Sequence, residues 1–194
     1  MMKKMLMAAL VLAAFVLVGC AQGTNPTAPK ATPLPPLTAP VFESEEDVLG
    51  LYNEITFDDT LATLTERYGE PTVETDANGD IYFWSKDGSG VAIVFFDNGR
   101  MRSKLVNFED VRQFSKLSQT PNLENVLSLS SDMMVDDVNL YLGAEGIEFI
   151  RIAQNSSLSP DFSIGYLWVN EKGEDVKILF NRNGKLDSLS YRLD

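Results

Sequence analysis

The fold of this chain is decided by the stretch Val91-Ala92-Ile93-Val94-Phe95-Phe96-Asp97-Asn98-Gly99, an apolar run that ends in a turn sequence. A short run of β-branched and aromatic residues is typical of a β-strand, and Asn-Gly favours the tight turn of a hairpin because both residues tolerate positive φ. Residues 81–84 before this stretch and 101–106 after it have the same strand-like character. The sequence therefore predicts an antiparallel meander.

Two helices are expected before this meander. Residues 42–51 and 60–68 carry apolar residues three and four apart, and acidic residues gather at the start of each segment, where the helix dipole favours negative charge. Gly69-Glu70-Pro71 should end the second helix, because glycine can adopt the left-handed cap and proline cannot continue the turn.

The same order of segments recurs further along the chain. Residues 46–59 align with 124–137 at an offset of 78 without a gap, and three later segments align in the same order at offsets of 84 and 85. These are 82–84 with 166–168, 91–95 with 176–180, and 98–101 with 183–186. Matches in one order indicate an internal repeat. We expect an α+β fold of two tandem repeats, each with two short helices packed on a three- to four-stranded antiparallel sheet. The repeats span 41–107 and 122–194, and a partly helical connector spans 108–121.

The N-terminus has the pattern of an export signal. Lys3 and Lys4 precede an apolar run of about thirteen residues, which is shorter than the roughly twenty that a membrane-spanning helix needs. Leu17-Val18-Gly19-Cys20 resembles the bacterial lipobox, in which the cysteine is lipidated after the preceding residues are removed. We expect residues 1–19 to be a lipoprotein signal peptide and Cys20 to be the lipidation site. The alternative for a lone cysteine is a small buried side chain.

Residues 20–40 follow as a segment rich in proline, threonine and alanine. Such a composition favours extended polyproline conformation, and at about 3.1 Å per residue it could separate a folded body from its anchor by roughly 60 Å. We interpret it as a spacer, with a docking motif for a proline-binding module as the alternative.

Charge and composition exclude several kinds of function. With 28 acidic and 16 basic residues, the chain has a net charge of −12, which disfavours nucleic acid and anionic lipid as partners. Its single cysteine and lack of histidine exclude Ser/His and Cys/His catalysis and imidazole zinc sites. Asp76-Ala77-Asn78-Gly79-Asp80 lacks the closing glutamate of a calcium loop and is expected to be a polar turn. The sequence indicates no metal and no cofactor.

Aromatic residues supply the candidate contact site. They could be core residues between helices and sheet, or a row on one sheet face that binds a partner, since Trp and Tyr dominate many interfaces. The face of residues 91–96 formed by Ala92, Val94 and Phe96 is apolar, whereas the corresponding face of 176–181 is partly polar. The apolar face is either covered by another part of the chain or binds a partner. The candidate partner-binding residues are Tyr82, Trp84, Val94, Phe96, Tyr166 and Trp168. Arg100, Arg102 and Lys104 form the most basic spot, interpreted as solvated strand ends or as a contact for an acidic partner.

Four motifs suggest a family. Thr56-Phe57-Asp58-Asp59, Gly69-Glu70-Pro71, Tyr82-Phe83-Trp84 and 95–99 resemble the repeat of the β-lactamase-inhibitor-protein-like family. They also resemble outer-membrane assembly lipoproteins of the SmpA/OmlA (BamE) type. The tandem arrangement is more similar to the inhibitor fold, and the lipobox is more similar to the lipoproteins.

Together these features predict a lipid-anchored binding module of the cell envelope that acts by protein–protein recognition without catalysis. It would lie outside the cytoplasm, on the cell membrane or the outer membrane, and bind an envelope or secreted protein. One alternative is a structural subunit of an envelope or outer-membrane assembly complex. Another is a wall or glycan hydrolase that uses two carboxylates.

Overall fold

The computed structural model describes residues 45–77, 79–86, 89–108, 110–115 and 121–193. The signal peptide, Cys20 and the proline-rich spacer lie outside the described residues. Four α-helices are present in the described residues: α2 (Glu45–Glu54), α3 (Leu61–Tyr68), α4 (Leu123–Leu127) and α5 (Val135–Leu142). A 3₁₀-helix, η1 (Val111–Phe114), lies between β4 and α4. The strands are β1 (Thr72–Asp76), β2 (Gly79–Lys86), β3 (Ser89–Phe95), β4 (Met101–Asn107), β5 (Ile147–Ala153), β6 (Phe162–Val169), β7 (Asp175–Phe180) and β8 (Leu186–Arg192).

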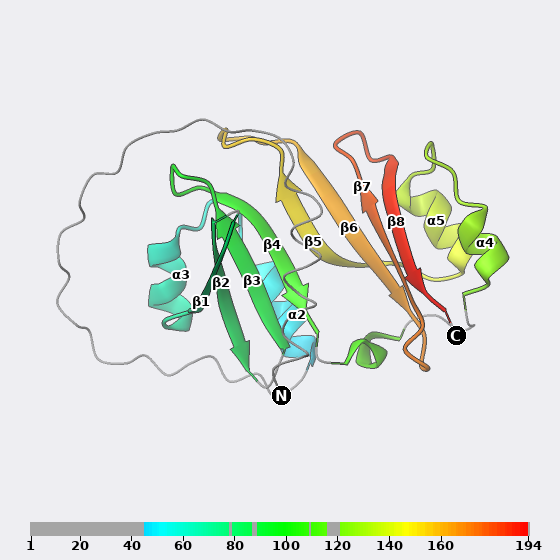
Figure 1. The fold of residues 1–194 in the computed structure, drawn as a ribbon, viewed down its shortest axis with the longest axis horizontal. Coiled ribbons are helices and arrows are strands. Elements are labelled where there is room, and N and C mark those ends of the chain that lie inside the picture. The colour runs from blue at the N-terminus through cyan, green and yellow to red at the C-terminus, as the bar shows by residue number, and fades with distance from the viewer. Residues whose placement is uncertain (1–44, 78, 87–88, 109, 116–120, 194) are drawn as a thin grey trace.

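All eight strands form one antiparallel sheet in chain order, β1 to β8 (Figure 1). The predicted fold class, two repeats that each pack two helices on a separate three- to four-stranded sheet, is therefore wrong. The sheet continues through the middle because β4 pairs with β5, with Ser103 opposite Ile152, Lys104 opposite Arg151 and Leu105 opposite Ile150. This pairing satisfies backbone groups that two separate sheets would leave unpaired at their edges.

Two strands were not predicted from the sequence. β1 is short and polar, and it lies at an edge of the sheet, where its exposed side chains give little apolar signal. β5 follows α5 closely. Its pairing with β4 joins the first half of the sheet, β1–β4, to the second half, β5–β8. Without β5 the sequence offered no partner for β4, which explains the mistaken expectation of separate sheets.

The helix ends follow local rules. α3 begins after Thr60, whose hydroxyl accepts a hydrogen bond from the Thr63 backbone N–H, and it ends at Gly69 with φ of 82°. α5 ends at Gly143 with φ of 74°. The second helix begins at different places relative to the aligned aspartates, because Asp59 precedes α3 whereas Asp136 and Asp137 lie in the first turn of α5.

Three apolar clusters of the described residues stabilise the sheet. Beneath α2 and α3, one cluster includes Trp84 and Val91. Beneath α4 and α5, a second includes Trp168 and Val176. The third draws on strands of both halves and on η1. Because neighbouring residues of a strand point to opposite faces, Val91 joins the first cluster and Ala92 joins the third.

Candidate functional site

The six predicted contact residues do not form one surface. Trp84 and Trp168 are each only 1% exposed and lie in the cores beneath the helices. Val94 is buried in the third cluster, which Trp84 and Trp168 do not join. Tyr82, Phe96 and Tyr166 are half-buried. In this structure the two tryptophans are core residues, so they are not available to contact a partner directly.

Each tryptophan is fixed by its indole N–H. Trp84 Nε1 donates to the carbonyl of Gly69, at the end of α3, over 2.8 Å. Trp168 Nε1 donates to Ala144 O at 3.0 Å and to Asn139 Oδ1 at 3.2 Å. Buried indole groups generally need such a partner, so these bonds tie each tryptophan to the end of a helix.

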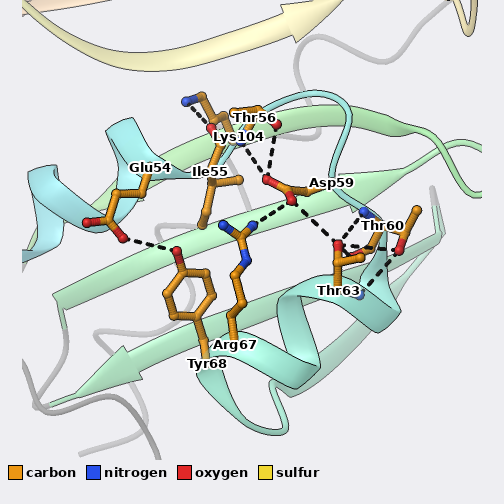
Figure 2. A network of polar contacts seen from close by, with 9 residues as sticks. All are labelled: Glu54, Ile55, Thr56, Asp59, Thr60, Thr63, Arg67, Tyr68 and Lys104. Atoms are coloured by element: carbon orange, nitrogen blue, oxygen red, sulfur yellow. Dashed lines mark hydrogen bonds and ion pairs between the residues drawn. The ribbon is translucent and has the colours of Figure 1, made fainter.

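Lys104 is the unexpected residue of the sheet. Although it was expected at a solvated strand end, its side chain is buried. Its Nζ donates to the carbonyls of Tyr52, at 2.6 Å, and Ile55, at 2.8 Å (Figure 2 shows the Ile55 contact). The ammonium also lies 4.0 Å from the centroid of the Tyr52 ring. Lys104 therefore satisfies orphan carbonyls at the C-terminus of α2, where the helix dipole favours a cation.

Burial shapes the ionisation of this lysine. Because burial disfavours the charged ammonium, the pKa of Lys104 falls from 10.5 to about 8, even though the carboxylate of Glu148 acts to raise it. The strand alternation could have revealed this position. Lys104 is in phase with Val106, which faces the core beneath α2, so the solvated interpretation was wrong.

A second network of polar contacts connects the two halves of the sheet. The Tyr52 hydroxyl donates to Glu148 Oε1 at 2.8 Å. Arg151 binds the same carboxylate with two hydrogen bonds, of 2.9 and 2.7 Å. Burial and the Glu148 carboxylate raise the pKa of Tyr52 well above its usual value. Glu148 and Arg151 belong to β5, so this hydrogen-bond network connects α2 to the second half of the sheet.

Asp59 organises the loop between α2 and α3 (Figure 2). Its Oδ2 accepts from the backbone N–H of Thr56 at 2.8 Å, and its Oδ1 lies 2.5 Å from Arg67 of α3. Partial burial acts to raise the pKa of Asp59, but the hydrogen bonds from Thr56 and Arg67 lower it overall. Nearby, the Tyr68 hydroxyl donates to Glu54 Oε2 at 3.1 Å. These contacts fix α3 against α2.

The other two members of the basic spot contact protein groups. Arg100 Nη1 donates to the carbonyl of Ser157 at 2.9 Å, which connects the β3–β4 turn to the β5–β6 loop. The guanidinium of Arg102 lies 5.8 Å from the centroid of the Phe96 ring. Arg100 also borders a small cavity beside Phe57 and Leu158. The three basic residues thus do not form one binding surface, because Lys104 is buried and its ammonium binds carbonyls at the end of α2.

Exposed apolar side chains gather elsewhere, on α4 and α5. Leu140 is 84% exposed and Leu127 is 62% exposed. We define the α4–α5 surface as Leu123, Leu127, Met134, Leu140 and Tyr141. The sequence did not reveal this surface, because these residues fit the helical apolar pattern, and that pattern does not show which side of a five-residue helix stays exposed.

No known protein family matches this chain, and no curated protein matches it either. The resemblance to the β-lactamase-inhibitor-protein-like family and to the assembly lipoproteins stays a prediction. Within the described part of the chain, none of the helices has the length and apolar character to cross a membrane.

Proposed function

We propose that this protein is a lipid-anchored module of the cell envelope that acts by protein–protein recognition and without catalysis. Lipidation at Cys20 would hold it on the membrane, and the spacer of residues 20–40 would let the folded body reach its partner. Two saturated chains on one cysteine suffice for stable anchoring, since each buried methylene contributes about 0.8 kcal/mol.

The α4–α5 surface is the observation that carries this proposal. Among the described residues, eight large apolar side chains are exposed, and five of them lie between residues 123 and 141. Single exposed apolar residues are common, but a concentration on one pair of helices is typical of a surface that another molecule covers. Protein recognition uses such surfaces, because burial of apolar area provides the main driving force.

The continuous sheet supports the same proposal. α2, β4 and β5 are connected through Lys104, Tyr52, Glu148 and Arg151. A body fixed in this way holds the two halves of the sheet in one arrangement, so the sheet loses little conformational entropy when a partner binds.

Protein–protein recognition can be tested in living cells. A photo-crosslinking amino acid replaces Leu140 in one full-length variant and Val73, which is 49% exposed on the distant edge strand β1, in a second variant. We expect a discrete crosslinked protein from at least one exposed position. Absence of a discrete product from these two positions and from Leu127, Leu158 and Tyr191 would contradict protein recognition.

The anchoring arm has a separate test. Cells that express the full chain are fed an alkyne-tagged fatty acid, and the Cys20→Ser variant serves as the control. We expect label on the wild-type protein, none on the variant, and release of the variant from the membrane fraction. Equal membrane recovery of both proteins, without label, would refute the anchor.

A further inference from the structure

The α4–α5 surface combines apolar side chains with acidic ones. Residues 122–142 contain the acids Glu124, Asp132, Asp136 and Asp137 and no lysine or arginine. All four acids are exposed. The segment thus presents leucines beside negative charge, which is a more specific signal than apolar exposure alone.

The apolar part cannot simply fold inward. Val126 of α4 and Val138 of α5 are completely buried and fix which side of each helix faces the core. Leu140 lies two residues after Val138, about 200° around the helix, so it points away from that core. Leu123 and Leu127 are one turn apart on α4, and 46% and 62% of their surface is exposed. The exposed leucines therefore belong to the outward sides of the two helices.

Other groups of the protein neutralise little of the negative charge of these four acids. Asp137 Oδ2 accepts a hydrogen bond from the Met134 backbone N–H at 2.9 Å, and Asp132 accepts one from the Ser130 hydroxyl. Within the described part of the chain, none of the four acids makes an ion pair with a basic side chain. The hydrogen bond from Ser130 lowers the pKa of Asp132, and the charge of Lys185, in the β7–β8 turn, acts in the same direction. The negative charge of the surface remains available to a partner.

From this combination, and resting on the proposed function, we infer that the α4–α5 surface docks a basic amphipathic segment of a partner protein. The apolar side of that segment would cover Leu127 and Leu140, and its lysines or arginines would lie against Glu124 and Asp136. Helix-in-groove recognition commonly combines apolar anchors with charges that set the orientation.

The negative charge of the α4–α5 surface favours a basic protein segment over a second copy of this chain or an anionic lipid surface. A second copy would bring the same four acids against this surface, and like charges that face each other disfavour association. An anionic lipid surface is disfavoured for the same reason, in a chain whose net charge is −12. A basic protein segment removes apolar area from water and neutralises the acids at the same time.

The chain offers a direct experiment because it contains one cysteine, Cys20, which the anchor occupies. Leu140→Cys introduces a single free thiol for an environment-sensitive dye, and Val73→Cys supplies the matched control. Each full-length, lipidated protein is placed in phosphatidylcholine nanodiscs. The probe is a synthetic amphipathic peptide of about eighteen residues, or five helical turns, with leucine on one face and lysine on the other. A second peptide replaces each lysine with glutamate.

We expect the lysine peptide to shift the emission of the dye at position 140 to shorter wavelength, with no shift at position 73 or with the glutamate peptide. On unlabelled protein, peptide affinity should fall about tenfold with Leu127→Ser and also with Glu124→Gln plus Asp136→Asn, each change corresponding to about 1.4 kcal/mol. Affinity should also fall as salt rises to about 0.15 M, where the Debye length is about 8 Å. Circular dichroism and the melting temperature check that each variant folds.

Several outcomes would overturn the inference. A dye at position 140 that is already blue-shifted in nanodiscs without peptide would identify the membrane as the occupant. A shift that depends only on protein concentration would identify a second copy. Equal affinity for the lysine and glutamate peptides, or no loss in the two variants, would exclude a basic segment. If cells nevertheless yield a discrete crosslink from position 73 or 158, protein recognition stands and only the α4–α5 surface is wrong.

Discussion

The two halves of the sheet each bury a tryptophan beneath helices, but they differ in how completely the helices are held. Among the residues that the structure describes, ten buried apolar residues form the core under α2 and α3 in the first half, and Lys104 binds the end of α2. In the second half six such residues form the core under α4 and α5, and leucines remain exposed on the outer side. The comparison suggests that the first half supports the body, whereas the second half offers the surface for binding.

The largest expected effect concerns the two tryptophans. Because both are almost completely buried, Trp84→Ala and Trp168→Ala should each lower the free energy of unfolding by about 3–5 kcal/mol. The β4–β5 pairing joins the halves, so either variant should shift one common unfolding transition. Urea denaturation followed by far-ultraviolet circular dichroism measures both effects.

Single-tryptophan proteins provide the control for this joint. Trp84→Phe leaves Trp168 as the fluorescent reporter of the second half, and Trp168→Phe leaves Trp84 for the first half. If the sheet unfolds as one unit, each reporter should show the same urea midpoint as circular dichroism on its own variant. Two separate midpoints, with one half unfolding while the other stays folded, would show that the halves are independent despite the shared sheet.

The second effect tests the polar anchor of α2. Lys104→Met retains most of the side-chain length but leaves the carbonyls of Tyr52 and Ile55 without this donor, which should cost about 1–3 kcal/mol at pH 7. Lys177→Met in β7 is the matched control, because Lys177 is half-buried and forms only a 3.5 Å pair with Asp175. The control should change stability by less than about 1 kcal/mol. Equal losses for the two variants would contradict a special role for Lys104.

The effect of Lys104→Met on the free energy of unfolding should depend on pH. Lys104 has a pKa of about 8 in the folded protein and 10.5 as its ordinary value, so between these values the unfolded chain holds more protons. Stability from this group therefore rises with pH above about 8, by at most about 1.4 kcal/mol per pH unit. The difference in unfolding free energy between wild type and Lys104→Met should widen from pH 7 to 9.5. A constant difference would place the lysine in an ordinary solvated environment.

A third effect compares the glycines that end α3 and α5. Gly69 has φ of 82° and ψ of −177°, a region open almost only to glycine, so Gly69→Ala should cost up to about 3 kcal/mol. Gly143 has φ of 74° and ψ of 14°, the left-handed helical region, so Gly143→Ala should cost about 1–2 kcal/mol. Thermal unfolding of both variants measures the order, and a larger loss at Gly143 would reverse the comparison.

The sequence predicted those parts of the fold that depend on neighbouring residues. The end of α3 at Gly69, the turn at Asn98-Gly99 and the strands around Trp84 and Trp168 follow local patterns, and the structure confirms them. The β4–β5 pairing could not be predicted in this way, because it joins residues about fifty positions apart. The residues that the pattern selected for partner contact were apolar and aromatic, and burial uses the same residue types.

The α4–α5 surface could not be predicted, because exposed residues can have the sequence pattern of core residues. Leu127 of α4 and Leu140 of α5 look like core residues in a helical pattern, but both lie on the side of the helix that faces away from the core. Lys104 looks like a surface residue, and only the packing of α2 over β4 buries it. In both cases the sequence shows the residue type, whereas the exposure depends on which element covers it.

The smallest expected effect on stability separates surface from core in the second half. Leu140→Ser and Val73→Ser remove side chains that are 84% and 49% exposed, so each should change the free energy of unfolding by less than about 0.5 kcal/mol. Loss of the apolar anchor should nevertheless weaken binding of the lysine peptide in Leu140→Ser and leave it unchanged in Val73→Ser. Urea denaturation and peptide titration of the same samples measure the two quantities. A stability loss of 2 kcal/mol or more in Leu140→Ser, on the order of a core truncation, would mean that Leu140 packs within the protein. The α4–α5 surface would then belong to the core, and the contrast between the two halves would disappear.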